Sequence, residues 1–179
     1  LVPVAGLNVS GVLVRLQGID VLCLTVYMAC SIHLSGANAH RLNTIERIIR
    51  YFDIPFILGG DFNMEPDQFQ EVSLGLTFLS STDSQLLVPC VPTCTKSLLG
   101  RVIDFGIMSI SLLPILQAID VVNTPTVPHL GVVVRLKRSA KQVRTRSLVV
   151  PKEFPAPPAE CGDGGKALCW YEGHEAPVP

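Results

Sequence analysis

The chain has 179 residues, a net charge of −1, 48% hydrophobic residues and only 16% charged residues. This composition fits one globular domain, with or without a tail, and it excludes a chain that is disordered throughout. No apolar run reaches the roughly 18–20 residues that cross a bilayer, so we expect no membrane span.

Basic residues gather near the C-terminal end of an otherwise acidic chain. Residues 1–134 contain ten acidic and six basic residues, whereas the stretch from Arg135 to Arg146 contains six basic residues and no acidic ones. We interpret this run as a solvated linker or localisation patch, with contacts to a phosphate backbone as the alternative. The sequence begins with Leu1 rather than Met and without a signal pattern, so we expect a fragment or a gene model that lacks its start. The compartment and the oligomeric state are not indicated.

The N-terminal part of the chain predicts two strands and a helix. Residues 11–28 are rich in Val, Leu and Ile, and Gln17-Gly18 stands where a hairpin turn is needed. Residues 34–52 place apolar side chains at helical spacing, with Ser35 or Asn38 available as the N-cap.

The middle of the chain predicts short strands and one short helix. Residues 55–60 form a continuous apolar run, which predicts a strand buried on both faces. A short helix is predicted at 66–72, a weaker strand at 76–80 and a loop at 88–97.

Two later segments predict the last strands. Residues 101–109 predict a strand that carries Asp104 in its middle. Residues 118–136 predict two strands joined by a Pro-containing loop, with His129 at the start of the second strand.

The order of these elements predicts a mixed α/β domain at 1–136. Residues 137–179 are basic and then rich in Pro and Gly, which predicts a mostly disordered tail. Zinc binding by Cys161, Cys169 and His174 in this tail is a disfavoured alternative.

The other cysteines indicate no disulfide framework. Cys23 and Cys30 lie in an apolar run, so we interpret them as small core residues. A metal pair at Cys90 and Cys94 stays open but disfavoured, because no second pair has finger-like spacing.

The stretch ILGGDFNMEP, residues 57–66, ends a predicted strand in two glycines followed by Asp61 and Asn63. If the strand persists, these two side chains face the same side. Gly59 and Gly60 would let a substrate approach the backbone. A carboxylate can activate a water and an amide can donate to a phosphate oxygen, which favours phosphodiester hydrolysis. An ordinary Asp/Asn turn is the equal alternative.

Asp104 is an acid within an apolar strand, so it requires a partner. From the residues alone, a structural salt bridge with Arg101 is favoured over a catalytic pair with a histidine. His129 precedes an apolar strand, where a lone histidine is most often a loop or capping residue. His33 and His40 flank the predicted helix start, and we expect both to be solvated.

The order of these residues resembles the endonuclease/exonuclease/phosphatase superfamily, which has the deoxyribonuclease-I-like fold. The family's GDFN stands at 60–63, its S-x-IDY strand corresponds to RVIDF at 101–105, and its closing SDH-x-P-V corresponds to VPHLGV at 127–132. The resemblance covers about residues 9–136. It implies a partial four-layer α/β sandwich with mixed, mostly antiparallel sheets and flanking helices.

The resemblance also implies Mg²⁺-dependent hydrolysis of phosphodiesters. Nucleic acid, as in retroelement endonucleases, is the first implied substrate, and lipid or inositol phosphoesters are the alternatives. Asp61 would align or activate the attacking water, and Asn63 would bind a phosphate oxygen. Asp104 would orient His129, which would stabilise or protonate the phosphoryl oxygen. Tyr27 stands where some members place a tyrosine that contacts phosphate, although a core or cross-strand role is favoured.

Two departures from the family pattern bear on activity. Pro128 stands where the family has an acid, and the family's Asn and metal-binding Glu belong to strands that precede anything in this sequence. Mg²⁺ is bound through carboxylates, so we expect weak or absent Mg²⁺ binding and impaired catalysis in this chain. A catalytically inactive remnant or binding module that keeps the fold is the alternative function.

Overall fold

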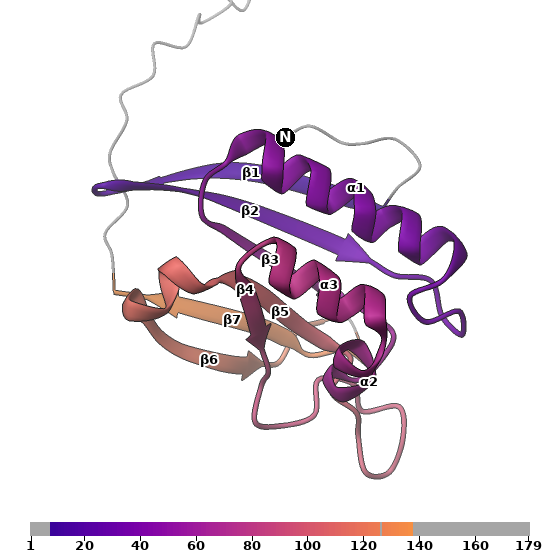
Figure 1. Ribbon diagram of the computed structural model, residues 1–179. Helices are drawn as coiled ribbons and strands as arrows, with labels where there is room; N and C mark the ends of the chain where they lie inside the picture. Colours follow the sequence, from indigo (N-terminus) through magenta and orange to yellow (C-terminus); the bar gives the residue numbers. More distant parts are fainter. Residues whose placement is uncertain (1–7, 126, 138–179) are drawn as a thin grey trace, which may run out of the picture. The chain divides into compact units, whose positions relative to one another are not determined.

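The computed structural model describes residues 8–125 and 127–137, drawn as helices and strands in Figure 1. The elements, in chain order, are β1 Val9–Leu16, β2 Ile19–Tyr27, α1 Gly36–Phe52, β3 Phe56–Asp61, α2 Pro66–Glu71, α3 Ser73–Ser81, β4 Ser84–Leu87, β5 Asp104–Ser109, the 3-10 helix η1 Ile110–Ile115, β6 Leu116–Val122 and β7 Gly131–Leu136. None of the helices in this part of the chain has the length and apolar content required to cross a bilayer.

Five strands form one sheet in the order β1-β2-β3-β5-β4, and β6 and β7 form a second sheet. The β2–β3 pair is parallel, and every other pair is antiparallel. The expected mixed, mostly antiparallel arrangement is therefore confirmed. The parallel pair follows from the chain path, because α1 returns the chain from the end of β2 to the start of β3.

Helices α1, α2 and α3 cover one face of the five-stranded sheet, as Figure 1 shows. Helix α1 buries Leu42, Ile45 and Ile49, which recur at the spacing of one helical face. These side chains pack on apolar residues of the sheet such as Phe56 and Leu58. The sequence pattern predicted this packing, because the apolar period of α1 and the continuous apolar run of β3 are both visible in the sequence.

The β6–β7 hairpin covers part of the opposite face. Leu116 and Val134 of the hairpin pack against Val21, Met108 and Leu112. No residue of β6 or β7 is fully buried. Helices, the five-stranded sheet and this thin second sheet make three layers, which agrees with the expected partial four-layer sandwich.

Two element predictions were wrong. Residues 76–80, expected as a strand, belong to helix α3, which buries Phe78. A short apolar run has no clear period, so local sequence cannot separate the two conformations. Strand β4 was missed, because Ser84–Leu87 has no strand pattern of its own and is defined by its pairing with β5.

Other expectations were correct in kind but displaced. Strand β5 begins at Asp104, so this acid lies at the strand's end rather than in its middle. Ser35 is the N-cap residue of α1, although its hydroxyl makes no capping bond, and Asn38 is buried inside the helix. The predicted tail 137–179 lies outside the described residues except for Lys137, as do Cys161, Cys169 and His174 within it. The domain boundary therefore stays a prediction.

Candidate active site

Asp61 and Asn63 stand where strand β3 ends. Asp61 is the last strand residue, and Asn63 has a positive φ of 52°, so the strand does not continue through it. The Asn63 backbone N–H donates to Asp61 Oδ1 at 2.9 Å, which closes a tight turn. The condition that the strand persists is therefore not met, yet both side chains line the same cleft.

Phe62 anchors this turn in the core. Its ring is fully buried and stacks on Phe105, with centroids 4.1 Å apart, while Phe69 meets it edge-on. Aromatic burial of this kind holds a backbone segment firmly. The turn that presents Asp61 and Asn63 is therefore fixed by the phenylalanine between them.

The two glycines before Asp61 have different roles. A Cβ on Gly60 would lie 1.9 Å from the Val26 carbonyl oxygen, so glycine is required for the packing of β2 against β3. A Cβ on Gly59 would meet nothing within 4 Å. The sequence had indicated that both glycines make room for a substrate, but at Gly60 the neighbouring strand occupies that room.

The side chain of Asn63 is largely engaged within the protein. Its Nδ2 donates to the Met28 carbonyl at 2.8 Å, and its Oδ1 accepts from Cys30 Sγ at 3.1 Å. These bonds tie the segment after β2 to the turn after β3. The Asn63 side chain also hydrogen-bonds to Asp61 and Tyr27, which opposes the rise in the pKa of each.

His129 lies against both aspartates. Its Nδ1 is 3.0 Å from Asp104 Oδ2 and 3.2 Å from Asp104 Oδ1. Its Nε2 is 4.0 Å from Asp61 Oδ2. The structure thus brings together three residues far apart in the sequence, in the order carboxylate, imidazole, carboxylate.

A short loop segment holds this arrangement in place. The buried Thr93 Oγ1 accepts the backbone N–H of Asp104 at 2.9 Å, and the Thr93 carbonyl accepts the N–H of Leu130 at 2.7 Å. Thr95 N–H donates to the Pro128 carbonyl at 3.0 Å. Sequence reasoning missed Thr93, because its importance comes only from bonds to two distant segments.

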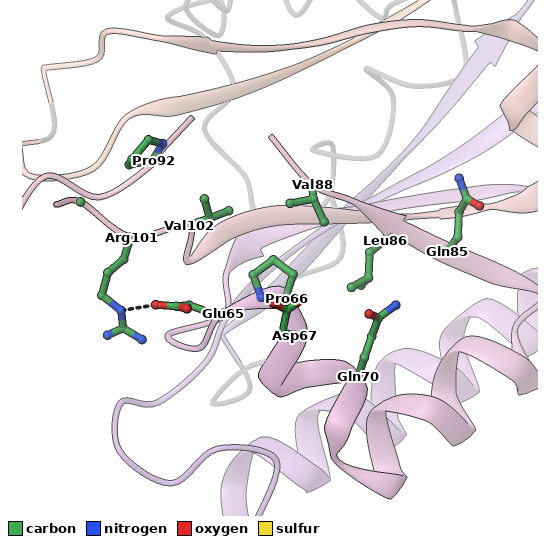
Figure 2. Close-up of a pocket in the computed structure, with 11 residues that line it drawn as sticks. Glu65, Pro66, Asp67, Gln70, Gln85, Leu86, Val88, Pro92, Arg101 and Val102 are labelled. Atoms are coloured by element: carbon green, nitrogen blue, oxygen red, sulfur yellow. Dashed lines mark hydrogen bonds and ion pairs between the residues drawn. The ribbon is translucent and has the colours of Figure 1, made fainter. Parts of the chain in front are cut away.

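Arg101 does not pair with Asp104, so the favoured structural salt bridge was wrong. Its Nε donates to Glu65 Oε1 at 2.9 Å, as Figure 2 shows. Glu65 is fixed as the N-cap of α2 by a capping box with Gln68. The pair borders a second hollow of about 550 Å³, and Arg101 also lines the cleft that contains His129.

Burial and neighbouring polar groups shift the pKa values of Asp61 and His129. Burial raises the pKa of Asp61 above its ordinary 3.8, and the nearby charge of Asp104 raises it further. The hydrogen bond with Asp104 raises the pKa of His129 above its ordinary 6.5, although burial opposes this. The site therefore favours a protonated imidazole beside Asp104.

The cleft around these residues has a volume of about 860 Å³ and is lined by both acidic and basic side chains. Asp61 is the only acidic residue lining it among the described residues, and His129 and Arg101 line it as well. His33 and Lys96 complete its set of basic side chains. His33, expected to be merely solvated, is exposed and faces this cleft. Sequence reasoning missed Lys96, because it lies in a loop whose fold is not readable locally.

Asp61, Asp104 and His129 can together hold a metal ion. One ligand atom from each lies within 4.8 Å of the other two. The charge of Asp104 disfavours the ionised form of Asp61, and a cation beside both carboxylates would offset this repulsion. In the arrangement found, however, Asp104 is bonded to His129, so a metal ion and the imidazole compete for that carboxylate.

The remaining candidate residues fall into two groups. Tyr27 ends β2 opposite Asp61 and is largely exposed at the cleft, so it is cross-strand but not a core residue. Its pKa is raised, chiefly by the adjacent Cys30. Cys90 is exposed and Cys94 is buried, and neither belongs to a group of three potential metal ligands in the described part of the chain.

Comparisons with known proteins rest on structure. No family model and no curated protein sequence matches this chain. The endonuclease domain of TRAS1, a telomere-specific non-LTR retrotransposon, superposes with a TM-score of 0.58 at 18% identity, covering 73% of this chain and 64% of that domain. The catalytic domain of Xenopus laevis APE2 gives a TM-score of 0.52 at 12% identity, covering 76% of this chain and 57% of that domain. The chain thus spans less than two thirds of either structure, and at these identities the similarity establishes the fold.

Proposed function

Because the chain has the deoxyribonuclease-I-like fold of the endonuclease/exonuclease/phosphatase superfamily, we propose that it hydrolyses phosphodiester bonds with the help of a divalent cation. The observation that carries the proposal is the His129 imidazole, hydrogen-bonded to Asp104 at 3.0 Å and facing Asp61 at 4.0 Å. Lys96 and Arg101 line the same cleft. Cationic side chains at a cleft attract an anionic substrate.

The chain's own residues have distinct tasks in this reaction. The Asp61 carboxylate orients a water molecule and accepts its proton as the water oxygen bonds to phosphorus. The P–O bond to the leaving oxygen breaks in the same step, and that oxygen takes a proton from solvent. Protonated His129, held by Asp104, donates a hydrogen bond to the phosphoryl oxygen on which negative charge grows. Asn63 lines the same cleft, where its Nδ2 group can turn a hydrogen from Asp61 or Tyr27 toward the phosphate. Tyr27 lies at the cleft's border, where its hydroxyl can contact the substrate.

A bound Mg²⁺ would add Lewis-acid stabilisation of the phosphoryl oxygens. Asp61 and Asp104 are the residues that would hold it, with His129 as the third member of the group. We expect weak Mg²⁺ binding and slow turnover, because Asp104 is engaged with His129 and the described cluster offers no third carboxylate.

Nucleic acid is the substrate class that we favour. Lys96 and Arg101 line the same cleft as Asp61 and His129, so they can contact phosphates next to the one that reacts. A small phosphomonoester would offer Lys96 no second phosphate to contact. Lipid and inositol phosphoesters remain the comparison substrates in the test.

The test is a cleavage assay on oligonucleotides and on a small phosphodiester, with Mg²⁺ or Mn²⁺ present. We expect Asp61→Asn and His129→Ala each to lower kcat by roughly a hundredfold or more. Asp53→Asn and His40→Ala are matched controls on α1 and its C-cap, outside the residues that line the cleft. Variants that cleave as fast as the parent would show that these residues do not carry the reaction.

A binding module without catalysis is the second candidate. Two observations favour it. The Asn63 side chain is hydrogen-bonded to the Met28 carbonyl and to Cys30 within the protein. The residue before His129 is Pro128, which carries no carboxylate. In that case the protein binds oligonucleotides in a salt-dependent way and cleaves nothing. Asp61→Asn would then leave binding unchanged or strengthen it, because it removes a negative charge.

A further inference from the structure

Strand β1 is an unprotected edge of the five-stranded sheet. It pairs with β2 along all eight of its residues, and no strand among the described residues pairs with its other side. It contains no proline and no bulge, and Arg15 is its only charged residue. Natural sheets usually protect long edges with such features, so an edge without them is suited to pairing with another strand.

An apolar groove of about 440 Å³ runs beside this edge, between β1 and the end of α1. Leu13 and Gly11 of β1 form one wall, and Ile48, Tyr51 and Phe52 of α1 form the other. Tyr51 is 84% exposed, and its ring meets Phe52 edge-on with centroids 5.4 Å apart. A second hollow is lined by the same two rings. The aromatic pair is therefore a ridge that borders both hollows, and the first of these is lined by residues of the β1 edge.

The charges around the patch favour a second copy of the chain as the occupant. Arg15 lies 3.9 Å from Asp20, and Arg50 is paired with Glu46 at 2.8 Å, so these four residues add no net charge. The exposed Arg47 and Asp53, near the end of α1, have opposite signs. A two-fold axis can therefore bring unlike charges together without a surplus of either sign.

We propose that two copies of this chain associate through their β1 edges. The two β1 strands pair antiparallel about a two-fold axis, which is the arrangement an identical edge on both copies allows. The Tyr51–Phe52 ridge of each copy packs toward the groove of the other, where it removes exposed aromatic surface from water. The groove and the cleft share no lining residue, so the proposal does not depend on catalysis.

The test is sedimentation velocity and light scattering of the full chain over a wide concentration range. We expect a dimer that dissociates on dilution. Leu13→Lys and Tyr51→Glu should each raise the dimer's Kd about tenfold or more, because each puts a charge into an apolar contact. Both side chains are exposed, at 39% and 84%, so the variants should keep the parent's circular dichroism and thermal transition.

Leu98→Lys is the matched control, since Leu98 is a fully exposed apolar residue outside the patch. It should leave the Kd unchanged. Hydrogen exchange provides a readout without mutation: the β1 amides should become better protected as concentration rises, while those of β4, the opposite edge, should not. A parent that stays monomeric at every concentration overturns the proposal. So does a dimer that Leu13→Lys and Tyr51→Glu leave intact, or one that Leu98→Lys weakens equally.

Discussion

Asp104 sets the protonation of His129, because its carboxylate is the imidazole's direct hydrogen-bond partner. In metal-free protein we predict that the pKa of His129, followed by NMR, lies above 6.5 and falls in Asp104→Asn. The control Asp53→Asn should leave it unchanged. A folded-state pKa above the unfolded value means that the pair stabilises the fold below 6.5, and that this contribution disappears as pH rises through the folded pKa.

The free energy of unfolding should therefore depend differently on pH in the parent and in Asp104→Asn. Asp104→Asn should cost about 1 kcal/mol or slightly more just below pH 6.5, the loss of one partly exposed charge-assisted hydrogen bond. The difference should shrink at alkaline pH. Urea unfolding at several pH values measures it, and a difference that grows with pH would contradict the assignment.

Lys96 is the residue whose role depends most directly on the substrate's charge. We predict that Lys96→Gln weakens binding of a single-stranded oligonucleotide and reduces the slope of log K against log salt by about 0.7. Arg50→Gln, at the end of α1 and outside the cleft, should change neither. Fluorescence anisotropy at several salt concentrations measures both quantities. An unchanged slope would mean that Lys96 contacts no phosphate.

At the scale of elements, the junction of β2 and β3 depends on one glycine. We predict that Gly60→Ala lowers the free energy of unfolding by at least about 2 kcal/mol, because the added methyl group would collide with the Val26 carbonyl. Gly59→Ala, one residue earlier and facing open space, should cost far less. Chemical denaturation of both variants measures the two free energies of unfolding. Equal decreases in Gly60→Ala and Gly59→Ala would contradict the collision with the Val26 carbonyl.

Elements with a strong local pattern were predictable from the sequence, and those defined by pairing were not. Helix α1 shows its apolar period, and the β1–β2 hairpin shows its turn, because both are stabilised by contacts close in sequence. Strand β4 exists through its pairing with β5, and α3 through burial of Phe78 against the core. Such contacts leave no periodic trace in a short segment.

Site residues that are defined by contacts between distant segments were likewise not predictable from local sequence. Motifs at the ends of strands were sufficient to select four of them, Asp61, Asn63, Asp104 and His129. Their catalytic roles stay predictions, although the structure brings the four together. The partner of Arg101 and the bonds of Thr93 were not predictable, because each joins segments whose approach is decided by the whole fold. Lys96 belongs to the same category.

At the scale of the whole molecule, the residues of the site lie on elements that are buried to different degrees. Asp61 and Asp104 lie on paired central strands of the larger sheet, whereas His129 lies on the connection between β6 and β7. Every residue of these last two strands is at least partly exposed to solvent. A thin two-stranded layer opens more readily than a buried sheet.

Partial opening of this hairpin would carry the imidazole away while the carboxylates stay in place. Hydrogen exchange of the β6 and β7 amides should accordingly be faster than that of the β3 and β5 amides. On heating, the proposed hydrolytic activity should be lost at temperatures where most of the secondary structure remains. The hairpin would then be the first part of the molecule to open, and its opening alone would separate His129 from Asp61 and Asp104.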